Sequence, residues 1–406
     1  MNDVTLLRDR TALAGFGHTL FGKRGELGHI PLQRLVMQAV IRACDDAGIS
    51  PKQIDGWTSY GSETVEGATL AAAFGSDHLR FTGMAWSGGG GGMGGAFLYA
   101  AMAVAAGQAD YVAVTRSIVQ VEDGSPGHYR RGQAFVGREV ERTEAGGFPS
   151  YGLASPGLTF SLAARRHMER FGTTIDHFGE VAISTRLMAA NNPLARFREP
   201  ITMEDHHNSR MIADPLRLLD YTMESDVASC VIVTTAERAR DLRQPLVRIA
   251  GVAMGAPRRF GGGLFTAAGG VSHQMADDDW VTAGQASVAR DLYNLAGLGP
   301  QDVDVAEIYD HFTPMVLQGL EAFGFVPLGE SGPFVADGNM RMGGAMPTNT
   351  HGGNLSECYA HGMTHVFEGM RQIRGVSSNQ VPGCEVALVV AGSSPAPTGA
   401  LLLRSA

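Results

Sequence analysis

Apolar residues along the chain follow two alternating patterns. Short continuous apolar runs predict strands, and four of these runs begin at Ala12, Tyr111, Arg248 and Glu385. Apolar residues spaced three and four positions apart predict amphipathic helices at residues 32–47, 96–106, 158–171, 175–190, 284–296, 315–327 and 361–374. Strands that alternate with helices of this length are typical of an α/β fold, in which helices cover a sheet.

One segment of the chain occurs twice. Residues 47–55 read AGISPKQID and residues 296–304 read AGLGPQDVD, so the second copy follows the first by 249 residues. Each copy comes after an amphipathic stretch and has a Gly where the helix should stop, a Pro soon after it, and an acidic residue before the next strand. The repeat therefore predicts a helix, a turn and a strand that recur in the same order.

A second correspondence lengthens the repeat. The glycine-rich run from Gly88 and the segment HGGNLSECY from His351 are each followed by a predicted helix, a glycine and a strand. Two such copies predict duplicated α/β lobes about a pseudo-twofold axis, one over residues 1–245 and one over residues 246–406. Residues from about 121 to 220 lack a strand rhythm and are expected to form an inserted loop subdomain with helices, over an active site or an interface.

Composition narrows the class of protein. The 406 residues carry a net charge of −9, which does not favour nucleic-acid binding. Four cysteines lie far apart without a C-x-x-C pair, so we expect neither a structural zinc site nor a disulfide framework. The N-terminus has no basic segment followed by a long apolar one, so we expect no signal peptide and a cytoplasmic protein.

A stretch of 28 residues without a charge, from 82 to 109, is not expected to span a membrane. Seven of the eight residues from 88 to 95 are glycine, which indicates a loop, and the apolar helix that remains is shorter than the roughly 20 residues of a span. The run contains G-x-G-x-x-G at Gly90, Gly92 and Gly95, but no clean strand precedes it, so a dinucleotide site is not favoured. We expect either backbone N–H groups that hold a substrate oxygen or a tightly packed loop.

Two polar segments carry candidate chemistry. In AEIYDHFTP, the residues Tyr309, Asp310 and His311 follow an apolar run, where a strand should end at the edge of a sheet. A buried tyrosine that makes one hydrogen bond is the structural alternative. In NTHGGNLSECYAHG (349–362), two glycines at a predicted helix start are surrounded by more polar side chains than a core loop would hold. A metal site there is not favoured, because the spacing of its His and Glu residues fits no zinc pattern.

These segments resemble the thiolase superfamily over nearly the whole chain, and most of all its sterol-carrier-protein-x branch. DPLRLLD (214–220) is similar to the branch's segment after the insertion, AEIYDHF resembles its E-x-H-D-x-F strand end, and HGGNLSECYAHG resembles its G-G…G-H-P loop. The resemblance implies the thiolase fold, which requires the internal duplication.

The chain departs from thiolases at the residues that react. The resemblance places Trp86, followed by Ser87, where thiolases carry the nucleophilic Cys, and it places Tyr309 and Tyr359 where they carry histidines. The late Cys is also missing from residues 391–400. Without a thiolate no acyl-enzyme forms, so we do not expect an ordinary thiolase or ketoacyl synthase. Paired tyrosines resemble instead the thiolase-like aldolases that cleave steroid acyl-CoA side chains in bacteria.

That resemblance implies retro-aldol cleavage of a β-hydroxyacyl-CoA, with no cofactor because CoA belongs to the substrate. The reaction needs a base for the hydroxyl proton, a stabilised thioester oxygen and an acid for the enolate carbon. We assign Tyr309 and Tyr359 as base and acid in an order that the sequence leaves open, with Asp310, His311 and His351 as further catalytic residues.

The oxyanion or substrate-binding site is expected among residues beside the glycines of both segments. Besides His351, its candidates are Trp86, Ser87, Gly88, Asn349, Gly352, Gly353 and His361.

The alternative function is a catalytically inactive thiolase-like protein that binds acyl-CoA or sterols, as in lipid transfer. The resemblance further implies a homodimer with the glycine-rich helix near its interface. It also implies a small partner with a zinc ribbon and an OB-like fold, in an α2β2 complex. For the aldolase, the resemblance implies release of a short acyl-CoA, either propionyl-CoA or acetyl-CoA, together with a ketone or aldehyde.

Overall fold

A computed structural model describes residues 6–61, 63–85, 89–120, 156–256, 283–392 and 397–405. Ten of its strands form one mixed sheet, in the order β10-β11-β12-β9-β1-β8-β5-β3-β4, with β2 paired to β8 off this path. Short antiparallel pairing between β1 and β9, as at Leu13 and Val247, joins the two halves. Among the described helices, none is long and apolar enough to cross a membrane.

The two halves of the sheet have matching strand orders. In the first half the strands are β1 (Thr11–His18), β2 (Gly22–Lys23), β3 (Gly56–Tyr60), β4 (Phe81–Ala85), β5 (Val112–Ile118) and β8 (Ser225–Thr235). In the second half they are β9 (Val247–Gly255), β10 (Val305–Ile308), β11 (Val386–Ala391) and β12 (Thr398–Arg404). Outward from the junction, β1-β8-β5-β3 therefore corresponds to β9-β12-β11-β10, as the repeat predicts. The boundary between residues 245 and 246 stays a prediction.

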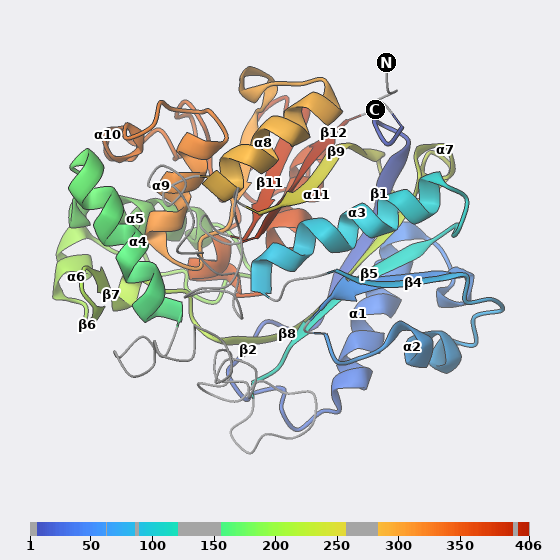
Figure 1. The fold of residues 1–406 in the computed structure, drawn as a ribbon. Helices are drawn as coiled ribbons and strands as arrows, with labels where there is room; N and C mark the ends of the chain where they lie inside the picture. The colour runs from blue at the N-terminus through green and yellow to red at the C-terminus, as the bar shows by residue number, and fades with distance from the viewer. Residues whose placement is uncertain are drawn as a thin grey trace, which may run out of the picture.

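Helices cover the sheet in corresponding positions. The helices α1 (Leu32–Ala47) and α8 (Ala283–Ala296) pack on β1 with β8 and on β9 with β12, respectively. The helices α3 (Gly92–Ala105) and α11 (Met363–Arg374) lie in one apolar core that contains strands of both halves. Figure 1 shows α3 crossing the middle of the molecule. The predicted helices are confirmed here, with small shifts at their ends.

The repeated segment folds in the same way in both copies. Gly48 and Gly297 end their helices with positive φ angles of 79° and 69°, which glycine adopts without the steric cost that a side chain would bring. A 3-10 turn follows each of them, at Pro51–Gln53 and Pro300–Asp302, before β3 and β10. The local sequence thus determines the local structure twice.

The glycine run contains more regular structure than expected. The 3-10 turn Gly89–Gly91 leads into α3, and FTGMA forms the edge strand β4, where the sequence showed no clean strand. A Cβ atom on Gly94 would lie 2.4 Å from the Cα atom of Gly399, so helix and strand approach closely. Contact with the second half of the sheet compensates for the low helix propensity of glycine.

The described elements of the inserted segment lie on one side of the molecule, away from α1 and α2 (Gly67–Phe74) (Figure 1). Its described elements are α4 (Pro156–Phe171), α5 (Ile175–Ala190), α6 (Met203–Asn208), β6 (Met211–Ala213) and β7 (Leu216–Arg217). The last two form a small separate sheet that the sequence did not predict. Helix α5 packs on α9 (Thr313–Ala322) and α10 (Ser331–Ala336), which follow β10. The remaining short helix, α7 (Ala236–Ala239), follows β8.

Candidate active site

Two tyrosines from segments 50 residues apart meet at the end of β10. Tyr309 directly follows this strand, and its N–H donates to the carbonyl of Val390 on β11 at 3.0 Å. Tyr359 follows the π-helical turn Gly353–Glu357. The hydroxyl of Tyr309 donates to the hydroxyl oxygen of Tyr359 at 3.3 Å. Tyr309 is 2% exposed and Tyr359 is half-buried, so the pair runs from the core towards more open surroundings.

The Tyr309 phenol is held in its neutral form. Burial raises its pKa well above the usual value, and Tyr359, Tyr60 and Asp310 raise it further. A Cβ atom on Gly90 would lie 2.5 Å from the Cζ atom of Tyr309, so the glycine run packs directly against the ring. A neutral phenol can donate a hydrogen bond or a proton, but it is a poor base.

His311 lies beside this phenol and is also uncharged. The centroids of the His311 and Tyr309 rings are 4.7 Å apart. Burial lowers the pKa of His311 to about 3, although Asp310 opposes the shift. His311 was predicted as a further catalytic residue beside the two tyrosines. A neutral imidazole brings no positive charge that would favour a phenolate.

Asp310 connects the end of β10 to the turn that precedes Tyr359. Its carboxylate accepts hydrogen bonds from the backbone N–H groups of Asn354 at 2.7 Å and Leu355 at 3.2 Å. The Nε2 atom of His365 lies 3.2 Å from the same carboxylate. Asp310 therefore fixes the position of the turn relative to Tyr309, and its contacts indicate a positioning role in place of the predicted catalytic one.

Asn349, Gly352 and Gly353 make contacts that hold the backbone of this segment in place. The Asn349 side chain donates to the carbonyl of Ile308 at 2.8 Å and accepts from its N–H at 2.7 Å. The N–H of Gly352 donates to the carbonyl of Asn349 at 2.9 Å. Gly353 has a φ angle of 59°, and a Cβ atom there would lie 2.0 Å from Asp310. These contacts argue against the predicted oxyanion role of Asn349 and Gly352 and give Gly353 a packing role.

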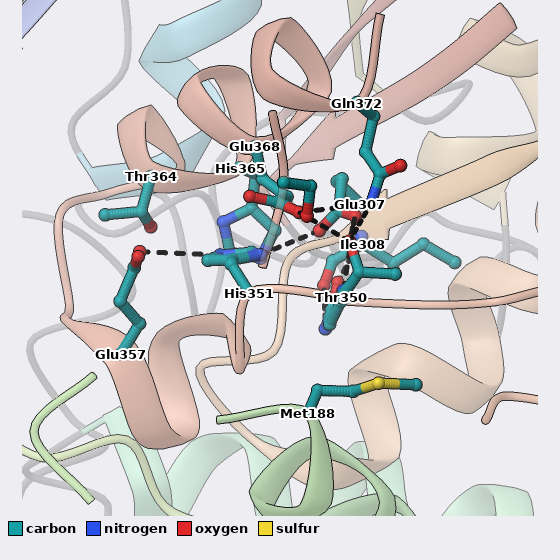
Figure 2. A network of polar contacts seen from close by, with 12 residues as sticks. Met188, Glu307, Ile308, Thr350, His351, Glu357, Thr364, His365, Glu368 and Gln372 are labelled. Atoms are coloured by element: carbon teal, nitrogen blue, oxygen red, sulfur yellow. Dashed lines mark hydrogen bonds and ion pairs between the residues drawn. The ribbon is translucent and has the colours of Figure 1, made fainter. Parts of the chain in front are cut away.

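His351 points into a separate buried cluster of carboxylates. Figure 2 shows its ring between Glu307 and Glu357, with its Nδ1 atom 2.9 Å from one and its Nε2 atom 3.9 Å from the other. Burial alone would lower the pKa of His351, but Glu357 and Glu307 outweigh it and raise the pKa to about 9. Both ring nitrogens face carboxylates, so this geometry argues against the predicted oxyanion role of His351.

The rest of this cluster ties the loop to α11. The Thr350 hydroxyl lies 2.8 Å from carboxylate oxygens of both Glu307 and Glu368. Arg371 pairs with Glu357 at 3.3 Å and with Glu368 at 3.4 Å. Buried charges are tolerated when they are paired in this way, and removing one partner is costly. The cluster thus stabilises the loop that carries Tyr359 and makes no described contact with either phenol.

His361 is part of a polar group that the sequence analysis missed. Its Nδ1 atom accepts from Arg116 on β5, and its carbonyl accepts from the hydroxyl of Tyr60 at 3.0 Å. The rings of His361 and Tyr359 meet edge to face, with centroids 4.9 Å apart. Tyr60 lies 249 positions before Tyr309, the offset of the repeat, and Arg116 is a charged residue in a predicted strand. The repeat offset and the charged residue within a strand were therefore two signals for this polar group that the sequence contained.

None of the four cysteines is suited to attack a thioester. All of them lie in the described part of the chain and are buried. Burial raises the pKa of Cys44 and of Cys384 to about 12, and it raises the pKa values of Cys230 and Cys358 as well. A protonated, buried thiol is a weak nucleophile.

Part of the predicted site lies outside the described residues, namely Trp86, Ser87 and Gly88. Within the described ranges, no group of three His, Cys, Asp or Glu side chains is placed to hold a metal ion.

Comparisons with known proteins find several relatives. A family model described as Thiolase C-terminal domain-like matches residues 268–398. The 17-hydroxy-3-oxo-4-pregnene-20-carboxyl-CoA lyase of Mycobacterium tuberculosis is 40% identical over 98% of this chain and 100% of its own length. A steroid side-chain-cleaving aldolase of Thermomonospora curvata is 38% identical over 98% of this chain and 99% of its own length.

A solved structure gives the same result. The structure described as an Ltp2-ChsH2(DUF35) aldolase superposes with a TM-score of 0.88 and 37% sequence identity, covering 98% of this chain and 99% of that one. The fold is therefore the thiolase fold, with a mixed α/β sheet, as the resemblance implied.

Proposed function

Because the chain belongs to the thiolase-like family of steroid side-chain-cleaving aldolases, we propose that it cleaves a β-hydroxyacyl-CoA thioester of a steroid by a retro-aldol reaction. The observation that carries the proposal is the contact between the Tyr309 and Tyr359 hydroxyls at 3.3 Å. Two phenols in contact can move a proton to and from one substrate without a covalent intermediate.

The reaction requires one proton to leave and another to arrive. A base removes the proton of the β-hydroxyl group, and the C–O bond becomes a carbonyl while the bond between the α and β carbons breaks. The electron pair of that bond passes to the α carbon and forms an enolate of the thioester. An acid then protonates the α carbon, which gives a ketone or aldehyde and a shorter acyl-CoA.

The two tyrosines differ in a way that supports an assignment of roles. Tyr309 is the deeper phenol, and its raised pKa keeps it protonated, which suits the acid. Tyr359 is half-buried and its oxygen accepts the Tyr309 hydrogen bond, which favours its negative charge. We therefore assign Tyr359 as the base and Tyr309 as the acid.

The test uses 17-hydroxy-3-oxo-4-pregnene-20-carboxyl-CoA, the compound in the name of the M. tuberculosis relative. Retro-aldol cleavage of this compound releases a 17-ketosteroid and propionyl-CoA, and both can be followed by mass spectrometry. Tyr309→Phe and Tyr359→Phe should each lower the cleavage rate by about 10²–10⁴-fold without changing the folded state. Wild-type turnover in either variant removes that tyrosine from the mechanism.

The same assay separates cleavage from binding alone. An inactive acyl-CoA or sterol carrier would retain the thioester and release no ketone. Saturable binding without product, with the partner protein present, would favour that alternative.

We also propose a homodimer, in which the edge strand β4 contributes to the interface. The strand has no neighbour on one side of the described sheet, and Met84 on it is 47% exposed. Tyr99 and Met102 on the adjacent helix α3 are 36% and 49% exposed. An unpaired edge strand with apolar side chains favours association. Light scattering should give twice the mass of the chain, and Met84→Glu should lower it.

A second protein is expected to complete the assembly. The solved aldolase relative is described as a complex of Ltp2 with ChsH2(DUF35). We propose a small DUF35-type partner with a zinc ribbon for this chain, in an α2β2 complex, and no cofactor beyond the CoA of the substrate. Co-expression followed by light scattering and zinc analysis tests the partner. A chain that cleaves the thioester fully when alone would contradict it.

A further inference from the structure

The buried side chain of Arg116 contacts one ring nitrogen of His361. The Nε and Nη2 atoms of Arg116 lie 3.0 and 2.8 Å from the Nδ1 atom of His361, so two guanidinium nitrogens converge on one imidazole nitrogen. Arg116 is 1% exposed and His361 is 7% exposed. The contact joins β5 to the segment before α11, across 245 positions of sequence.

The surroundings hold both side chains in place. The Arg116 guanidinium lies 5.2 Å from the centroid of the Tyr60 ring and 3.7 Å from the carboxylate of Glu63. Glu63 in turn accepts hydrogen bonds from the backbone N–H and the hydroxyl of Ser117, next to Arg116. The Tyr60 hydroxyl fixes the carbonyl of His361, which has a left-handed φ angle of 53°. A non-glycine residue with positive φ is uncommon and indicates a constrained position.

The arginine contact determines where the imidazole proton lies. Guanidinium nitrogens only donate, so the Nδ1 atom of His361 must offer its lone pair and carry no proton. A neutral ring then carries its proton on Nε2. Burial, followed by the charge of Arg116, lowers the pKa of His361 well below its usual value. The ring therefore stays uncharged at neutral pH.

We propose that Arg116 is a positioning residue that fixes His361 as the neutral Nε2–H tautomer, so that this imidazole acts as an uncharged hydrogen-bond donor beside Tyr359. This inference rests on the proposed retro-aldol reaction. A neutral imidazole is a much weaker acid than an imidazolium. It can stabilise the developing thioester enolate oxygen without protonating it, which leaves protonation of carbon to a phenol.

The charged and titratable groups around His361 come from four segments. Arg116 approaches from β5, Tyr60 and Glu63 from the end of β3, His311 from the end of β10, and Tyr359 from the turn before α11. Arg116 contributes a positive charge, and burial keeps His311 and Tyr60 neutral. The carboxylate of Glu63 lies 3.7 Å from the arginine.

The decisive experiment reads the tautomer directly by ¹⁵N NMR of the histidine rings in the full chain with its partner. The His361 signal is assigned by its loss in His361→Gln. We expect an unprotonated Nδ1 and a protonated Nε2 from pH 6 to pH 8, and Arg116→Met should let part of the population carry the proton on Nδ1. A protonated Nδ1 in the wild type, or a ring that already titrates, would overturn the proposal.

Kinetics give the second readout. Arg116→Met should lower kcat by about 10–100-fold and change KM by less than about threefold. His361→Gln keeps one acceptor for Arg116 and one donor, so it should retain at least about ten times the kcat of His361→Leu. Equal kcat values for these two variants would contradict the donor role.

Two further variants distinguish an effect on the tautomer from a simple loss of folding. If Arg116→Met is insoluble, Arg116→Lys replaces it in the test. This variant keeps the positive charge with a single donor group and should preserve the tautomer. Arg374→Lys is the matched control, because the Arg374 side chain is also buried and pairs with Asp46 at 2.8 Å at the C-terminal end of α11, whereas His361 precedes its N-terminus. It should lower stability without moving the His361 signal or the pH profile.

The outcomes separate this inference from the proposed function. The NMR measurement needs no substrate, so a wild-type protein that shows the expected tautomer but releases no ketone would contradict only the retro-aldol function. A protein that cleaves the thioester with the opposite tautomer would contradict only the role of Arg116.

Discussion

Tyr60 and Tyr309 occupy equivalent positions in the two copies of the repeat, but their hydroxyl groups make different hydrogen bonds. Tyr60 is the last residue of β3, Tyr309 directly follows β10, and 249 residues separate them, as they separate the repeated segments. Both are buried, and burial raises the pKa of both. The hydroxyl of Tyr60 donates to a backbone carbonyl, whereas that of Tyr309 meets a second phenol. Duplication supplies the position, and the loops around it supply the chemistry.

The strands that neighbour β3 and β10, which are β5 and β11, also differ between the two halves. Gly56 pairs with Val112 in the first half and Val305 with Ala387 in the second, so Arg116 and Ala391 correspond by strand register. The first half thus places a cation beside its tyrosine, where the second half places a methyl group. The second half instead brings in the loop that carries Tyr359. In the proposed mechanism, the first half holds the positioning residue and the second half presents the two tyrosines.

The largest expected difference is between Tyr309→Phe and Tyr60→Phe. The first removes the proposed acid and should lower kcat by about 10²–10⁴-fold, with little change in melting temperature. The second leaves the buried carbonyl of His361 without its partner, which costs about 1–3 kcal/mol of stability, and should lower kcat by less than about tenfold. Steady-state kinetics and thermal unfolding of both variants check this. Equal losses of kcat would show that the two positions are equivalent in function.

The next effect concerns the turn before Tyr359. Gly353→Ala places a Cβ atom 2.0 Å from the Asp310 carboxylate at a φ angle of 59°, so we expect a loss of about 2–5 kcal/mol and reduced cleavage by the folded fraction. Gly343→Ala is the matched control, because its φ angle is 81° but nothing lies within 4 Å. It should cost about 1–2 kcal/mol from backbone strain alone. Chemical unfolding measures both, and similar losses would show that Asp310 moves aside easily.

A smaller effect should appear in the pH dependence of stability. The pKa of His351 is about 9 in the folded protein, above its ordinary value, because Glu357 and Glu307 outweigh the cost of burial. Its contribution is therefore fully present below about pH 6.5 and is lost as the pH rises through 9. His351→Gln should flatten this loss in urea unfolding between pH 6 and pH 9. His207→Gln, at a side chain that is 41% exposed, should keep the wild-type slope.

The smallest effects compare the two helix ends of the repeat. Gly48→Ala and Gly297→Ala each force a side chain into the left-handed region, at φ angles of 79° and 69°, and should each cost about 1–2 kcal/mol. Cleavage by the folded protein should be unchanged. Unfolding free energies that differ by more than about 1 kcal/mol would show that the two copies carry unequal shares of the stability.

Local patterns were sufficient for most of the elements. The predicted helices at 32–47 and 175–190 have the same bounds in the structure, because apolar spacing and a definite N- or C-terminal signal agree there. The glycine run was predicted as a loop, and α3 nevertheless begins at Gly92. Its helical residues are stabilised by strands of the other half, which no local pattern records.

The candidate site shows the same division. The strand end at Tyr309 and the loop at Tyr359 were recognisable from their polar residues and from a family resemblance. His351 was predicted to bind an oxyanion, and it faces Glu307 and Glu357 instead, because the fold brings a distant strand against it. Arg116 was overlooked, since its partner lies 245 positions away.

The sequence by itself determined the repeat, the α/β elements, the absence of a cysteine in the place of the nucleophile, and the two tyrosines that replace histidines. These are encoded in neighbouring residues, where periodicity and turn chemistry act over a few positions. Only the tertiary structure decided which side chains face one another, which of them are neutral, and which hold others in place. Protonation and hydrogen bonding depend on burial and on charges a few ångströms away, and these come from segments that the chain brings together only when it folds.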